Sequence, residues 1–161
     1  MFCQFNCLFP SIEFKLAFST FKFNAWEETV ELTEHAKDFP YILTTNRELE
    51  HYNCGAMTRR TANEQILQDD YLMIHPNDAQ AHLINEGDYV CIESPRGKVD
   101  VKARITDEVK EGILSTTFHF PEIMINNLTG DIHDSEAMCP EYKVVAVRIR
   151  KSKGKYKKEL V

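Results

Sequence analysis

The side chains best suited to bind a polar, anionic ligand are concentrated in one stretch of this chain. A short apolar run, Tyr41-Ile42-Leu43, ends abruptly, and a polar loop continues from there to residue 60. Its hydroxyl, imidazole and guanidinium groups belong to Thr44, Thr45, Arg47, His51, Thr58, Arg59 and Arg60. Such groups form hydrogen bonds with phosphates, ribose hydroxyls and ring nitrogens. The alternative is a solvated loop at the end of a strand, because loops are usually polar.

The order of these groups resembles that of a known family. In the C-terminal domain of molybdopterin oxidoreductases, most closely in formate dehydrogenase catalytic subunits, an apolar strand precedes Leu-Thr-Thr-x-Arg, His-Tyr and Gly-x-Met-Thr-Arg-Arg. The corresponding positions are Leu43-Thr44-Thr45-Asn46-Arg47, His51-Tyr52 and Gly55-Ala56-Met57-Thr58-Arg59-Arg60. The resemblance implies a domain that binds molybdopterin guanine dinucleotide, with its molybdenum or tungsten held mainly by other domains.

A second polar loop extends the resemblance. It follows an aromatic strand end, contains an Asn-Leu-Thr motif and finishes with Pro-x-Tyr-Lys before the last strand: Phe118-His119-Phe120, Asn127-Leu128-Thr129 and Pro140-Glu141-Tyr142-Lys143. The resemblance implies that Asn127 and Lys143 contact the pterin or its phosphates, with His119 and Tyr142 as further candidate contacts. The alternatives are a turn-forming Asn and a strand-edge Lys. For His51 and His119, a structural role within the loops is equally open.

The elements that must position these loops are short strands. Lys98 to Ile105 alternates between apolar and charged residues, which predicts a strand with one buried and one wet face. Other apolar runs predict strands at residues 41–43, 71–74, 88–94, 113–120 and 144–149. Ser94-Pro95-Arg96-Gly97 has the residues of a type I turn, so the third and fourth strands should form a hairpin.

Helices are expected to be few and short. Asn77 is a good N-cap for a helix over residues 79–84, and Gly87 can adopt a left-handed conformation after it. Residues 61–68 have helical character, and residues 27–38 read as a linker or a short helical turn. No apolar periodicity is evident in residues 1–20, although phenylalanine recurs there.

This pattern predicts a mainly β protein with short peripheral helices. The order of strand, short helix, Gly-Asp, strand and hairpin resembles a six-stranded double-psi β-barrel of the aspartate decarboxylase-like kind. The family resemblance begins near Phe23-Asn24-Ala25-Trp26. We therefore expect a lead-in outside the family at residues 1–22, the dinucleotide-binding barrel at 23–150 and a basic tail at 151–161.

Composition narrows the possible functions. The net charge of −6 argues against general binding of nucleic acid. No apolar run approaches the roughly 20 residues that a membrane-spanning helix needs, so no membrane contact is expected. The five cysteines are an odd number without close pairing, which predicts reduced thiols in a cytoplasmic protein.

The sequence predicts no catalytic residue and no metal ligand of its own. The family holds its iron–sulfur cysteines, metal-binding residue and catalytic His and Arg in other domains, so we expect the isolated chain to be inactive. The implied partner is the catalytic and iron–sulfur portion of a formate dehydrogenase-like subunit, if it is encoded separately. A non-catalytic double-psi barrel that serves as an interaction module is the alternative. Self-cleavage of the aspartate decarboxylase type is excluded, because no glycine precedes a serine.

Overall fold

The computed structural model describes residues 13–16, 19–22, 30–133 and 136–152. The Trp motif near residue 26 and most of the basic tail lie outside these ranges. Two strands that the sequence did not predict, β1 (Glu13–Leu16) and β2 (Ser19–Lys22), pair antiparallel as a hairpin. They fall within the expected lead-in.

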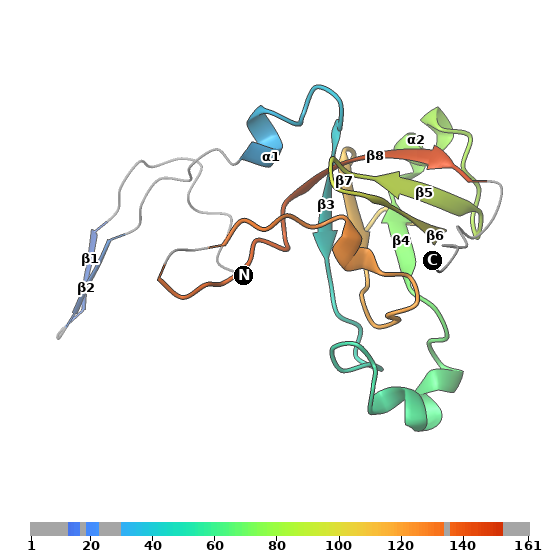
Figure 1. The fold of residues 1–161 in the computed structure, drawn as a ribbon, viewed down its shortest axis with the longest axis horizontal. Coiled ribbons are helices and arrows are strands. Elements are labelled where there is room, and N and C mark those ends of the chain that lie inside the picture. The colour runs from blue at the N-terminus through green and yellow to red at the C-terminus, as the bar shows by residue number, and fades with distance from the viewer. Residues whose placement is uncertain (1–12, 17–18, 23–29, 134–135, 153–161) are drawn as a thin grey trace.

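The main body is a closed β-barrel, shown in Figure 1. Its strands are β3 (Tyr41–Thr45), β4 (Tyr71–Ile74), β5 (Tyr89–Glu93), β6 (Lys98–Ile105), β7 (Ile113–Thr116) and β8 (Val145–Lys151). Around the barrel they lie in the order β3-β7-β4-β6-β5-β8. The prediction of a mainly β, six-stranded barrel with short helices is confirmed.

The strand order contains an internal two-fold relation. Exchanging β3 with β6, β4 with β7 and β5 with β8 maps the order onto itself. The parallel pair of β3 and β7 then becomes the parallel pair of β6 and β4. The antiparallel pair of β5 and β6 likewise becomes that of β8 and β3. Two interlocked halves related in this way form a double-psi barrel.

The apolar faces of these strands fill the barrel. Val99, Val101 and Ala103 of β6 are buried, as their alternation predicts, and pack in one cluster with residues such as Leu43 and Leu72. Asp100, on the other face of β6, is also buried, and its carboxylate accepts a hydrogen bond from the Ser152 hydroxyl at 3.0 Å. The prediction that this face of β6 is wet is therefore wrong at Asp100.

In the described residues, short helical segments lie outside the barrel: α1 (Val30–Thr33), η1 (Thr58–Arg60), η2 (Ala62–Gln65), α2 (Pro76–Ala81) and η3 (Ile125–Asn127). The prediction of Asn77 as the N-cap of α2 was wrong. His75 is the N-cap, and its ring Nδ1 accepts a hydrogen bond from the Asn77 amide at 3.2 Å. Pro76 explains the earlier start, because proline favours the first helical position and an extended residue before it.

β7 is also shorter than predicted. The apolar pattern runs to residue 120, but the strand ends at Thr116. Beyond it, the Asp70 carboxylate accepts hydrogen bonds from the amides of His119 and Phe120, at 2.9 and 3.0 Å. A side chain thus takes the donors that a strand ladder would have used, and the chain turns away from the barrel.

Candidate functional site

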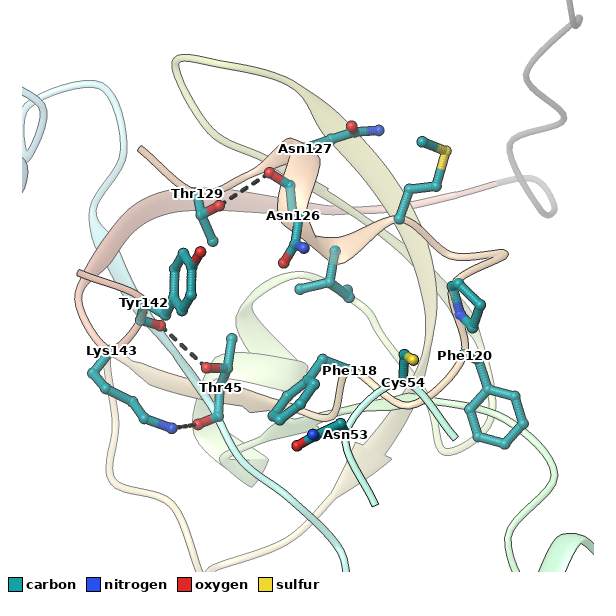
Figure 2. Close-up of a pocket in the computed structure, with 13 residues that line it drawn as sticks. Thr45, Asn53, Cys54, Phe118, Phe120, Asn126, Asn127, Thr129, Tyr142 and Lys143 are labelled. Carbon is teal, nitrogen blue, oxygen red and sulfur yellow. Dashed lines mark hydrogen bonds between the residues drawn. The ribbon is translucent and has the colours of Figure 1, made fainter. Parts of the chain in front are cut away.

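A cavity of about 500 Å³ opens beside the barrel where the loops after β3 and β7 meet the approach to β8 (Figure 2). Aromatic and aliphatic side chains form much of its lining, and amides, hydroxyls and one ammonium group complete it. The lining residues are Thr45, Asn53, Cys54, Phe118, Phe120, Pro121, Met124, Ile125, Asn126, Asn127, Thr129, Tyr142 and Lys143.

One wall joins the end of β3 to the segment that precedes β8. The Thr45 hydroxyl donates a hydrogen bond to the Tyr142 carbonyl at 3.2 Å, and the Lys143 ammonium donates to the Thr45 carbonyl. Thr45 is buried, whereas Tyr142 and Lys143 are exposed. Lys143 therefore brings a positive charge to the rim, where an incoming anion can compete for its ammonium donors.

A second wall is formed by η3 and the residues around it. Met124, immediately before η3, adopts a left-handed conformation with φ 59°, and so does Asn53 with φ 48°. The Thr129 hydroxyl donates to the Asn126 carbonyl at 3.0 Å, which closes the turn after η3. Both Asn126 and Asn127 contribute to the lining; Figure 2 shows the Asn126 amide pointing into the cavity and the Asn127 side chain at its outer edge, pointing away.

The composition of the lining defines what the cavity can bind. Phe118 and Phe120 offer aromatic surface, and the Asn and Thr side chains offer both donors and acceptors. An apolar pocket with a few polar groups is typical of small-molecule and cofactor sites. The arrangement suits a flat heterocycle with a polar edge, with an anionic group near Lys143.

The residues predicted from the sequence divide between this cavity and its surroundings. Thr45, Asn127, Tyr142 and Lys143 come together in the lining. Thr44 is half-buried on β3, beside Ser115 in the register of the parallel strand β7. The other candidates are Arg47, His51, Thr58, Arg59, Arg60 and His119, and these lie outside the lining.

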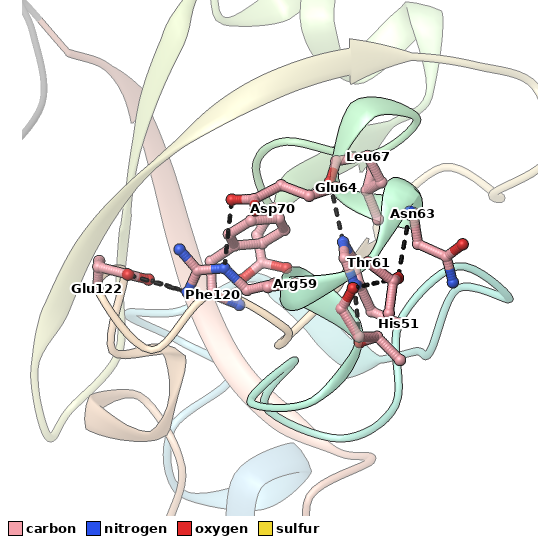
Figure 3. A network of polar contacts seen from close by, with 10 residues as sticks. His51, Arg59, Thr61, Asn63, Glu64, Leu67, Asp70, Phe120 and Glu122 are labelled. Carbon is pink, nitrogen blue, oxygen red and sulfur yellow. Dashed lines mark hydrogen bonds and ion pairs between the residues drawn. The ribbon is translucent and has the colours of Figure 1, made fainter.

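His51, labelled in Figure 3, and Thr58 bond to each other within the loop between β3 and β4. The His51 side chain is buried; its Nε2 lies 2.9 Å from the Leu67 carbonyl, and its Nδ1 lies 3.0 Å from the Thr58 hydroxyl. The neutral tautomer with the proton on Nε2 satisfies both contacts. Through these two contacts, His51 connects the start of the loop between β3 and β4 to Thr58 and Leu67 farther along it.

The arginines occupy different environments. Arg59 pairs with the Glu122 carboxylate at 2.9 Å and lies over the Phe120 ring, 4.8 Å from its centroid (Figure 3). Arg47 is exposed and lies 5.6 Å from the centroid of the Tyr52 ring. Arg60 is exposed at the end of η1. Arg59 thus packs against the ring of the cavity residue Phe120, while Arg47 and Arg60 remain at the surface.

His119 is fully buried between two residues that line the cavity. Its Nε2 accepts a hydrogen bond from the Glu48 amide at 2.9 Å, and its Nδ1 donates to the Asn53 carbonyl at 2.6 Å. Because Nε2 accepts from a backbone N–H, the ring is neutral. Both ring nitrogens are therefore engaged, and His119 holds the first loop against the second.

Sequence reasoning missed most of the apolar lining and the carboxylate that supports it. Phe118 and Phe120 were recognised only as part of a motif, and Asn53, Cys54, Met124 and Ile125 carried no signal of their own. Asp70 is fully buried. In sequence it is the second of two adjacent acids before a strand, which reads as a surface feature.

One carboxyl group near the cavity is perturbed. Burial raises the pKa of Glu141, the nearby charge of Glu31 raises it further, and the guanidinium of Arg96 opposes them. Glu141 directly precedes Tyr142 in the chain but does not itself line the cavity.

Within the ranges described, no group of three or more His, Cys, Asp or Glu side chains is arranged to hold a metal ion. None of the helices in the described part of the chain is both long and apolar enough to cross a membrane.

Comparison with known proteins identifies the family. The family described as "Molydopterin dinucleotide binding domain" matches residues 41–146, from the first strand of the barrel into its last. The chain belongs to this family. The cavity and both of its walls fall inside the matched region.

Two curated relatives extend the match. The chain is 41% identical over 127 residues to the F420-dependent formate dehydrogenase subunit alpha of Methanocaldococcus jannaschii, covering 78% of this chain and 19% of that protein. It is 31% identical over 125 residues to the assimilatory nitrate reductase catalytic subunit of Bacillus subtilis, covering 76% of this chain and 18% of that protein. The chain thus spans about a fifth of the length of these relatives.

Among solved structures, acetylene hydratase from Pelobacter acetylenicus has the same fold. The TM-score is 0.68 at 18% identity, and the similarity covers 79% of this chain and 21% of that one. At this identity the likeness concerns the fold alone. It agrees with the six-stranded barrel described above.

Proposed function

We propose that this chain is the molybdopterin guanine dinucleotide-binding domain of a formate dehydrogenase-like oxidoreductase. The observation that carries the proposal is the cavity in which two sequence motifs, almost a hundred residues apart, meet through Thr45 and Lys143. The greater identity to a formate dehydrogenase subunit than to a nitrate reductase favours formate as the substrate of the whole enzyme.

The lining fits such a cofactor. A pterin or guanine ring has apolar faces and an edge of donors and acceptors, which the aromatic rings and amides of the cavity match. Asn127 and Tyr142 would hold the ring, and Thr45 and Lys143 would hold the adjoining polar part. When bound, the cofactor supplies the molybdenum or tungsten centre at which redox chemistry occurs.

The remaining candidates fall into two groups. Arg47, Arg60 and Thr44 are not buried and would meet the phosphates of a ligand that extends beyond the cavity. His51, His119, Thr58 and Arg59 already have partners within the loops and would keep the two loops in place. This division follows from which side chains the fold leaves accessible.

The rest of the enzyme is the proposed partner. The catalytic and iron–sulfur portions would belong to the same polypeptide or to a separate one, because the relatives are about five times longer than the matched region. We place the protein in the cytoplasm, because the three cysteines in the described ranges, Cys54, Cys91 and Cys139, are free thiols.

Titration calorimetry with two halves of the cofactor, GDP and 6-hydroxymethylpterin, tests the proposal. We expect the wild type to bind at least one of them with a Kd in the roughly millimolar range. Lys143→Ala should weaken GDP binding about fivefold, because a partly exposed charged hydrogen bond contributes about 1 kcal/mol. Its melting temperature should stay near that of the wild type, because the side chain is exposed, although it donates a hydrogen bond to the Thr45 carbonyl.

Two controls separate binding from folding. Lys110→Ala removes another exposed lysine, outside the cavity, and should leave the Kd unchanged. Val101→Ala removes two buried methyl groups and should destabilise the fold by about 2 kcal/mol without altering the Kd. Absence of binding by the wild type at millimolar concentrations of either probe would contradict the proposal. So would a Lys143→Ala variant that binds GDP as well as the wild type.

A further inference from the structure

The turn between β5 and β6 is fixed by its own hydrogen bonds. The Ser94 amide donates to the Gly97 carbonyl at 2.8 Å. The Ser94 hydroxyl accepts hydrogen bonds from the amides of Arg96 and Gly97, at 3.2 and 3.3 Å. Ser94 is buried at 4% exposure, so these bonds are shielded from water. The turn therefore presents Arg96 and Gly97 in one defined position.

That position lies against the cavity wall built around η3. Arg96 Nε donates to the Leu128 carbonyl at 3.1 Å, and Leu128 stands between two residues that line the cavity, Asn127 and Thr129. Gly97 approaches so closely that a Cβ atom there would lie 2.6 Å from the Asn127 carbonyl oxygen. Two adjacent residues of the turn thus support this wall from behind.

A single buried carboxylate connects this support to the other wall. Glu31 of α1 is 2% exposed, and its Oε1 accepts a hydrogen bond from Arg96 Nη2 at 2.6 Å. Its Oε2 accepts a hydrogen bond from the Ala146 amide of β8, also at 2.6 Å. Ala146 follows Lys143 by three residues, so the carboxylate connects the turn behind η3 to the strand that directly follows the segment containing Lys143.

A contribution to the stability of the fold does not by itself explain the Glu31–Arg96 ion pair. An ion pair with a buried carboxylate seldom stabilises a fold more than apolar residues of the same size would, because the carboxylate loses its hydration; Glu31 is 2% exposed here, whereas the Arg96 side chain is 27% exposed. The Glu31–Arg96 pair instead sets positions, since it binds the Leu128 carbonyl, between two lining residues, and the Ala146 amide on β8, three residues after Lys143. Glu31 also precedes the region that matches the family, which begins at residue 41.

We propose that Glu31 and Arg96 are positioning residues that set the distance between the two walls of the cavity and so determine its affinity for the heterocycle. This inference rests on the proposed function of the cavity. It assigns a role to α1, a helix outside the matched family region, and to a turn that does not itself contribute to the lining.

The test combines ligand binding with local hydrogen exchange in the full chain. Arg96→Lys keeps the charge but cannot bond to Glu31 and Leu128 through a planar fork. We expect it to raise the Kd of the better-bound probe, GDP or 6-hydroxymethylpterin, about five- to tenfold. Amide exchange should accelerate in residues 125–129 and at Ala146, while the core strands β4 and β6 stay protected.

Two further variants sharpen the result. Gly97→Ala would push the Asn127 carbonyl without altering any charge, and should weaken binding in the same direction. Arg148→Lys is the matched control, because Arg148 also pairs with a glutamate, Glu93, at 2.9 Å, but its side chain is 53% exposed and lies outside the cavity. It should change neither the Kd nor the exchange of residues 125–129.

The possible results are distinct. If the wild type binds neither probe, the proposed function fails, and local exchange in Arg96→Lys still decides whether the pair holds the walls. An Arg96→Lys variant with wild-type Kd and wild-type exchange would overturn the inference. Faster exchange spread evenly over β4, β6 and the cavity walls would overturn it as well, because the pair would then stabilise the whole fold and not the cavity.

Discussion

At the residue scale, the side chain that does most to hold the candidate site in place is Asp70, which lies outside both sequence motifs. Its carboxylate accepts hydrogen bonds from the Thr117 hydroxyl at 2.6 Å and from two amides, those of His119 and Phe120. Phe118 and Phe120 line the cavity on either side of His119. One buried carboxylate thus fixes the aromatic surface that a ligand would contact.

Asp70→Ala should therefore be strongly destabilising. It leaves two buried N–H groups without an acceptor, which costs about 3 kcal/mol in the free energy of unfolding. Asp69→Ala is the matched control, because the neighbouring carboxylate pairs with the part-exposed Lys102 at 3.2 Å and should contribute less than about 1 kcal/mol. Urea unfolding of both variants gives the comparison, and equal losses would show that Asp70 has no special structural role.

The elements that matter most are the two loops, and one glycine controls how they meet. Gly55 has φ +69°, and a Cβ atom there would lie 2.9 Å from the His119 carbonyl oxygen and 2.8 Å from Arg59 Cδ. The first loop can approach the second only because this position has no side chain.

Gly55→Ala should cost clearly more stability than Gly112→Ala. Gly112 also has a positive φ, +78°, but no neighbouring atom lies within 4 Å of the place that an alanine methyl would take, so alanine there carries only the left-handed penalty of about 1 kcal/mol. At Gly55 the contact with backbone adds to that penalty. Chemical denaturation measures both. If the two variants lost the same stability, the contact between the loops would be looser than the structure indicates.

At the scale of the whole molecule, stability should depend on pH through Glu141. Burial and the charge of Glu31 raise its pKa above the usual 4.5, so the folded state favours the protonated carboxyl. The stabilisation is fully present below pH 4.5 and is lost as the pH rises through the raised pKa of the folded state. Glu141→Gln should therefore be more stable than the wild type at neutral pH, and this advantage should shrink below pH 4.5.

Glu93 provides a control of opposite sign. The Arg148 guanidinium lowers the pKa of Glu93, so its ionised form stabilises the fold above pH 4.5, and this contribution is lost as the pH falls through the lowered pKa. Glu93→Gln should be less stable than the wild type at neutral pH. Urea unfolding across this pH range measures both variants; the same sign of change in the two would refute these assignments.

The activity of the whole molecule follows from its length relative to the enzymes it resembles. The purified 161-residue chain should not reduce a dye with formate, because it corresponds to about a fifth of a formate dehydrogenase subunit. A complete formate dehydrogenase in the same assay is the positive control. Reduction above the buffer blank by the chain alone would mean that the barrel contains a redox centre of its own.

The sequence by itself determined the existence of the six barrel strands, the turn between β5 and β6, and the family. Lys98 to Ile105 forms the strand that its alternation predicts, and Ser94 to Gly97 forms the turn, because these signals depend on neighbouring residues. Local signals failed where a distant group intervened. β7 ends early because Asp70, some fifty residues away, takes its amides.

Only the tertiary structure decided which candidates share the cavity. Closure of the barrel brings Thr45 to Lys143 and Glu31 to Arg96, pairs that are 98 and 65 residues apart in the chain. It also gives His51 and His119 partners within the loops and leaves Arg47 and Arg60 at the surface. A motif records which residues are present, but their contacts depend on how strands distant in sequence pair around the barrel, and that is a property of the whole fold.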